Sequence, residues 1–186
     1  MLDSMAFVIF LVIIALVFDF LNGFHDSSNS ISTIVSTRVL SPRQAVLWAA
    51  FFNFVAAFLI GTQVAHTVGK GIIHIDIVDN LIILSALFGA ISWNITTWFF
   101  GLPSSSSHAL IGGLIGAGIA KGGITTLVWS GIIKTTLFIF LSPTIGLILG
   151  FIFMTLSMNL NRHSNIAKTD KLYRQLPLHS SAVYST

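Results

Sequence analysis

Residues 22–30 read NGFHDSSNS, and residues 101–108 read GLPSSSSH. Each stretch follows a long apolar run and carries a glycine or a proline, two residues that interrupt helices. In a chain that crosses a bilayer, polar groups at such an interruption face a cavity rather than lipid. The polar stretch (22–30) and the serine stretch (101–108) therefore predict one shared site that holds a small anion together with a cation.

The composition places most of the chain in lipid. Of its 186 residues, 54% are hydrophobic and 8% are charged, whereas soluble domains carry about 25% charged residues. The chain has no cysteine, which excludes disulfides, thiol nucleophiles and cysteine-bound metals. The sequence shows no nucleophile–base pair and no transition-metal spacing. We therefore expect a membrane protein that is not an enzyme and has no cofactor.

The apolar runs predict an all-α membrane protein with about five transmembrane or re-entrant helical segments. These segments are 5–37, 42–66, 81–100, 104–120 and 125–158. A straight helix over 5–37 would be about 50 Å long, too long for the ~30 Å hydrocarbon core. We therefore predict a break in the first segment near Asn22 and Gly23.

The basic residues predict the limits and the orientation of the membrane domain. The formal net charge is +3, and four basic residues fall near the end of the chain: Arg162, Lys168, Lys171 and Arg174. This pattern is typical of a membrane-flanking tail, since a nucleic-acid site would add a basic face with stacking aromatics. We predict a membrane domain over 1–158 and a truncated, basic cytoplasmic connecting segment over 159–186, with the N-terminus outside.

Asp26 and Asn29 are candidate ligands for a cation. They are three residues apart, so they share a face of a helical turn. A carboxylate and an amide carbonyl are hard oxygen ligands that suit Na⁺, at Asp26 above all, or a proton-binding site. The alternative is that Asp26 caps a resumed helix. His25 is a candidate proton relay, although a histidine in such a place is more often a hydrogen-bonded structural residue.

Four consecutive serines are candidate ligands for an anion: Ser104, Ser105, Ser106 and Ser107. Pro103 before them and a glycine-rich run after them predict that a helix begins here. The free N–H groups and the positive dipole end of a helix attract anions, and hydroxyl groups add neutral donors for a tetrahedral oxyanion. The alternative is an ordinary serine cap. His108 is a second candidate proton relay.

These motifs resemble a known family, the inorganic phosphate transporters or PiT family. The polar stretch is similar to the family signature GANDxAN, although His25 stands where the family often has asparagine. The matching positions are Gly23, Asp26, Asn29 and Ser30. Residues 36–45, STRVLSPRQA, and the serine stretch are similar to the bacterial branch of the family.

The resemblance implies symport of inorganic phosphate, coupled to Na⁺ or H⁺, by a multi-pass protein of the bacterial inner membrane. Asp26 and Asn29 would bind the coupling cation, and Asn29 with the four serines would contact phosphate. The family fold has two inverted repeats, each with its own Asp/Asn motif, and we find one such motif here. We therefore expect the N-terminal repeat only, one half of an inverted-repeat transporter fold, which pairs with a second repeat or with another copy of itself.

The residues also allow two other functions. Gly112 and Gly116, like Gly118 and Gly122, have the spacing that lets helices approach closely, which suits a non-transporting membrane assembly subunit. If the serines only cap a helix, the chain fits a cation or metal permease. The expected partners are inorganic phosphate, the lipid bilayer and a second half, with no nucleic acid.

Overall fold

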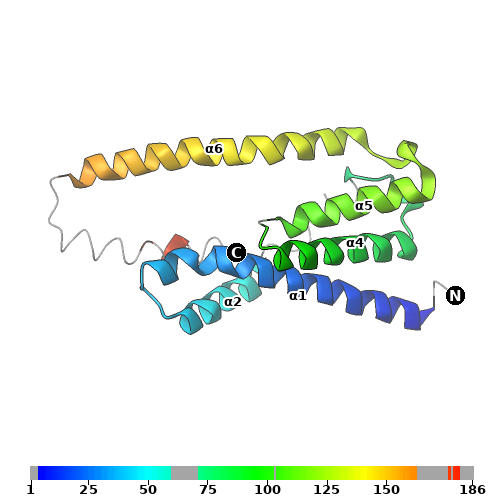
Figure 1. The fold of residues 1–186 in the computed structure, drawn as a ribbon, viewed down its shortest axis with the longest axis horizontal. Helices are drawn as coiled ribbons and strands as arrows, with labels where there is room; N and C mark the ends of the chain where they lie inside the picture. Colours follow the sequence, from blue (N-terminus) through cyan, green and yellow to red (C-terminus); the bar gives the residue numbers. More distant parts are fainter. Residues whose placement is uncertain (1–3, 60–70, 103, 163–175, 177, 181–186) are drawn as a thin grey trace. The chain divides into compact units, whose positions relative to one another are not determined.

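The structure is a computed structural model that describes residues 4–59, 71–102, 104–162, 176 and 178–180 (Figure 1). Its elements are α1 (Met5–Ser36), α2 (Pro42–Leu59), η1 (Ile75–Ile77), α4 (Asn80–Phe99), α5 (Ser106–Gly122), η2 (Ile124–Thr126) and α6 (Trp129–Asn161). The predicted all-helical class is confirmed. The chain divides into two compact units, the first of residues 1–28 and 62–132 and the second of residues 29–61 and 133–186.

Three of the described helical segments are long and apolar enough to cross a membrane: Met5–Asp26, Asn80–Phe99 and Trp129–Asn161. The predicted segment 104–120 corresponds to α5, a helix of 17 residues. The predicted segment 42–66 begins with α2, a helix of 18 residues, and its residues 60–66 lie outside the described part of the structure. The first and last spans have no buried residue in their most apolar windows, as expected for side chains whose solvent is lipid. The predicted ranges 81–100 and 104–120 match α4 and α5 closely.

The predicted break near Asn22 and Gly23 is wrong, because α1 is one continuous helix through both residues. A glycine inside a helix costs only about 1 kcal/mol. The helix itself also offers partners to polar side chains: the Nδ1–H of His25 donates to Leu21 O at 3.2 Å. The continuous apolar run of the sequence ends at Leu21, and the polar stretch follows it as part of the same helix, so no break is needed.

In the second unit, the end of α1 and the start of α2 contribute three of the buried residues: Ile34, Ala45 and Ala49. Between the two helices, Arg38 adopts a left-handed φ of 55°, the conformation that commonly ends helices. α2 then begins at Pro42, where the predicted segment 42–66 begins, and proline is common at the first position of a helix. Gln44 Oε1 accepts hydrogen bonds from the N–H and the hydroxyl of Ser41, at 3.1 and 2.8 Å.

α4 and α5 pack side by side as a hairpin within the first unit (Figure 1). The buried residues of α4 are Ile82, Ala86, Leu87, Ala90, Asn94 and Thr97. Gly113 of α5 lies against the backbone of Ala86, where an added Cβ would overlap the Ala86 carbonyl oxygen and lie 3.1 Å from its Cα. Glycine at position 113 therefore sets how closely the two helices approach.

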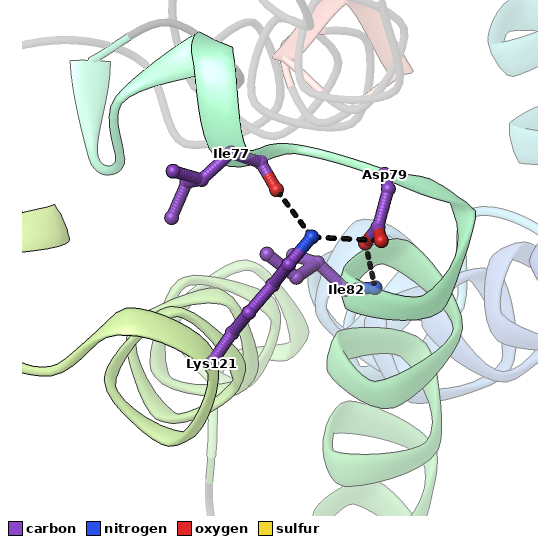
Figure 2. A network of polar contacts seen from close by, with 4 residues as sticks. All are labelled: Ile77, Asp79, Ile82 and Lys121. Carbon is purple, nitrogen blue, oxygen red and sulfur yellow. Dashed lines mark hydrogen bonds and ion pairs between the residues drawn. The ribbon is translucent and has the colours of Figure 1, made fainter.

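Lys121 ties the end of α5 to the loop before α4 (Figure 2). Its Nζ lies 2.7 Å from Asp79 Oδ2 and donates to Ile77 O at 2.9 Å. Asp79 also caps α4, because its Oδ1 accepts from the Ile82 N–H at 3.0 Å. Two hydrogen bonds hold the pKa of the Asp79 carboxyl below its usual value. The larger effect comes from Lys121 and the smaller one from the Ile82 N–H.

We expect acid to weaken this end of the hairpin. Because the pKa of Asp79 is lower in the folded state than in the unfolded state, its stabilising contribution is complete at neutral pH. That contribution is lost as the pH falls below about 4. The effect is small, since the Lys121 and Asp79 side chains are 40% and 46% exposed and solvent screens the pair.

The check is the thermal unfolding midpoint in detergent, measured at neutral pH and at pH of about 3. Lys121→Met should lower the midpoint at neutral pH and reduce the difference between the two conditions. Lys134→Met, which removes an exposed lysine from α6, should behave as the wild type does. If the wild type and Lys121→Met were equally sensitive to acid, the pair of Lys121 and Asp79 would not be the cause of the acid effect.

Candidate functional site

The serine stretch forms the N-terminus of α5, as predicted. Ser105 is the N-cap residue, with φ −100° and ψ 123°, and its side chain makes no capping hydrogen bond. The N–H of Ala109 donates to Ser105 O at 3.0 Å, which is the first hydrogen bond of the helix. Among the described residues, no carbonyl of an earlier turn accepts a hydrogen bond from the N–H groups of residues 106–108, so they can bind a ligand.

Thr97, near the end of α4, holds the serine stretch in place. Its Oγ1 lies 2.9 Å from Trp93 O and 3.0 Å from Ser104 Oγ. Its backbone oxygen accepts from the Leu102 N–H at 2.8 Å. The chain reverses at Gly101, whose φ of 65° is a conformation that favours glycine. One residue of α4 therefore fixes both sides of the turn that leads into α5.

A groove of about 650 Å³ runs between α4 and α5. Its polar lining residues are Ser85, Ser104, Ser105 and His108, and Trp93 contributes an indole ring. Glycines of both helices also line it and leave the space open. Among the described residues that line the groove, none carries a Lys, Arg or Asp side chain. The groove therefore offers neutral donors next to the positive end of the α5 dipole.

The structure distinguishes the four candidate serines. Ser104 is half-buried and Ser105 is exposed, and both line the groove. Ser107 is exposed, whereas Ser106 is only 2% exposed and its Oγ has no hydrogen-bond partner among the described residues. The contact of each serine with phosphate stays a prediction, and the geometry favours Ser104 and Ser105 most.

The polar stretch of α1 meets the end of α4 through two aromatic rings. Phe24 packs edge-on against Trp98, with ring centroids 5.9 Å apart, and Trp98 lies just before the serine stretch. Near Phe24, Asn22 and His25 are half-buried and Asp26 is exposed. This contact brings Phe24, in the part of the polar stretch that belongs to the first unit, close to the end of α4.

The cation pair and the proton relays stay predictions. Asp26 and Asn29 share a helical face because α1 continues through both, but the Asn29 side chain lies outside the described part of the structure. His108 lines the groove, and His25 bonds its own helix. Within the described residues, no group of three or more acidic or histidine side chains could hold a metal ion.

Sequence reasoning missed Trp93 and Thr97 as parts of the site. Their position could have identified them, because both lie within the last two turns of α4, just before the short turn that leads into α5. A hairpin places such residues opposite the first turn of the next helix, but the facing side of each helix depends on the helix register.

This arrangement of apolar spans, a helical hairpin and a donor-rich helix N-terminus defines the chain as an all-helical membrane protein. A family model described as "Phosphate transporter family" matches residues 22–184. The chain therefore belongs to the phosphate transporter family, a family of transporters and not of enzymes, and the predicted resemblance is confirmed.

Curated relatives and a solved structure agree with this family. Proteins named "probable low-affinity inorganic phosphate transporter" from Rhizobium meliloti (strain 1021) and Bacillus subtilis (strain 168) are 53% and 46% identical, over 94% and 95% of this chain. The chain covers 52% and 54% of them, so it spans about half of their length. A solved structure described as "The sodium-dependent phosphate transporter" is 23% identical, with a TM-score of 0.70 over 94% of this chain and 55% of that one; it supports the fold.

Proposed function

We propose that this chain forms one half of a carrier that moves inorganic phosphate across the membrane together with Na⁺. The observation that carries the proposal is the N-terminus of α5, where free N–H groups and two serine hydroxyls meet a groove lined by neutral groups. The names of the curated relatives support phosphate as the anion. The structural relative is named as sodium-dependent, which supports sodium as the coupling ion.

Neutral donors suit a carrier because a carrier must release what it binds. Hydroxyl and N–H groups can hold several oxygens of phosphate, and the positive end of the helix dipole adds attraction. Arginine side chains would bind the same oxygens in bidentate, charge-assisted pairs of greater strength. A site made from α5 and its serines therefore favours turnover over tight retention.

Asp26 and Asn29 would hold the cation. The apolar run at the start of α1 ends at Leu21, so a cation bound at Asp26 would lie beyond that run, near the contact of Phe24 with Trp98 of α4. A bound Na⁺ would offset the negative charge of Asp26 and of phosphate, and thereby reduce the cost of removing both from water. His25 and His108 are the groups that would serve if the coupling ion were H⁺.

The proposed carrier needs a second half. The chain spans about half the length of its relatives, and a second repeat or a second copy of the chain would complete the site. We place it in the bacterial inner membrane, with the N-terminus outside and residues 159–186 in the cytoplasm.

The test is uptake of labelled phosphate by liposomes that contain this chain alone or with the remaining half of the Rhizobium meliloti relative. We expect uptake that depends on a sodium gradient in the completed protein, and its loss in Asp26→Asn. Asp19→Asn is the matched control, because it removes the same charge about two turns earlier on α1. Absence of uptake in every combination would contradict the proposal, and uptake driven only by a pH gradient would assign the coupling to H⁺.

A further inference from the structure

Two buried polar side chains, one on α4 and one at the start of α5, have no hydrogen-bond partner among the described residues. Asn94 is 0% exposed, and neither its Nδ2 nor its Oδ1 has a hydrogen-bond partner among the described residues. Ser106 is 2% exposed, and its Oγ also has no hydrogen-bond partner among the described residues. Leaving such groups unpaired in a folded protein is costly. Two of them on α4 and α5, which pack against each other, therefore indicate a bound ligand that satisfies both.

The register of the hairpin places Asn94 and Ser106 at the same level. Ala86 lies against Gly113, and Thr97 Oγ1 lies 3.0 Å from Ser104 Oγ. Because the helices run antiparallel between these two contacts, position 94 on α4 falls close to position 106 on α5. Both side chains are shut off from solvent there, so the ligand must be small.

The chemistry of the two side chains selects water over an ion. Asn94 offers two N–H donors and one acceptor oxygen, and the hydroxyl of Ser106 can donate or accept a hydrogen bond. A cation would leave the Asn94 N–H groups unpaired and would lie at the positive end of the α5 dipole. An anion arriving through the groove would not reach them, because their neighbours Trp93 and Ser105 line the groove and they do not.

We propose that Asn94 and Ser106 bind one buried water molecule between α4 and α5, and that Asn94 is a positioning residue for the anion site. The water joins α4 to the first turn of α5, the turn whose free N–H groups are available to a ligand. Thr97 fixes the serine stretch from one side and the water fixes the helix from the other. The positioning role rests on the proposed function, whereas the water site does not.

The first test compares the thermal unfolding midpoints of Asn94→Leu and Asn94→Ser in detergent. If Asn94 only fills space, leucine, which has the branched outline of asparagine and keeps the site filled, is tolerated better than serine, which leaves a cavity. With a bound water, the order reverses, because serine keeps a donor and an acceptor while leucine expels the water and strands Ser106. A higher midpoint for Asn94→Leu than for Asn94→Ser overturns the water site.

Two further variants sharpen this comparison. Ser106→Ala added to Asn94→Leu should lower the midpoint no further than Asn94→Leu alone, because the shared water is already gone. Additive losses would overturn the proposal. Asn53→Leu is the matched control, since Asn53 is exposed and donates to Ala49 O of its own helix at 3.0 Å, and it should leave the midpoint unchanged.

The second test is phosphate affinity by titration calorimetry of the chain with its second half. Asn94→Leu should weaken binding about tenfold, the equivalent of one neutral hydrogen bond, whereas Asn94→Ser should stay within about threefold of the wild type. Unchanged affinity in Asn94→Leu overturns the positioning role. If the wild type binds no phosphate, the proposed function fails, and the order of the midpoints still decides the water site.

Discussion

Gly113→Val is expected to disrupt the α4–α5 hairpin and to cause the largest loss of stability of any single substitution proposed for this chain. A Cβ at this position overlaps the carbonyl oxygen of Ala86. Backbone cannot move aside as a flexible side chain can, so the helices must separate. Overpacking of this kind costs about 1–3 kcal/mol, and more where rigid backbone is the neighbour.

The measurement is the thermal unfolding midpoint in detergent, with Gly112→Val as the matched control. A Cβ at Gly112 meets nothing within 4 Å, so this neighbour should keep the wild-type midpoint although it narrows the groove. Equal midpoints for the two variants would mean that the close contact at Gly113 does not support the fold.

The double substitution Ser104→Ala/Ser105→Ala is expected to cause the largest loss of function. Both hydroxyls line the groove at the start of α5, and each hydrogen bond to a charged ligand contributes about 1.5–3 kcal/mol. Loss of two such bonds should weaken phosphate binding at least about a hundredfold. The fold should survive, because Ser105 does not cap the helix through its side chain and Thr97 Oγ1 still lies 2.9 Å from Trp93 O.

Titration calorimetry with phosphate measures this loss, on the chain together with its second half. Ser85→Ala is the control, because Ser85 lines the same groove from α4, away from the start of α5. It should bind phosphate within a few-fold of the wild type. Comparable losses in Ser85→Ala and in the double variant would show that the groove as a whole, and not the helix N-terminus, governs affinity.

The sequence predicts the limits of α4 and α5 well because its signals are local. Pro103, the serines and the glycine-rich run determine where α5 begins, and hydropathy determines the extent of α4. The same rules failed at Gly23, because a single glycine and several polar side chains weaken a helix by less than its continuous hydrogen bonding stabilises it. The length of the segment 5–37 does not locate a break, because its apolar run ends inside a longer, continuous helix.

The contacts between helices were less predictable. The spacing of Gly112 and Gly116 suggested a packing face, yet both line the open groove and Gly113 makes the close contact. The pattern identifies a helix rich in small residues, but the residue that faces the neighbour depends on helix rotation. The interface positions of Asn94 and Ser106 depend on the same rotation, so they emerge only from the structure.

The most direct test of the account is hydrogen–deuterium exchange at residues 106–108 of α5, with the chain in its completed form. If phosphate binds the free N–H groups at this helix end, adding sodium phosphate should slow exchange at these amides, and sodium chloride should not. Protection that appears elsewhere while residues 106–108 exchange at their original rate would contradict an anion site at the start of α5.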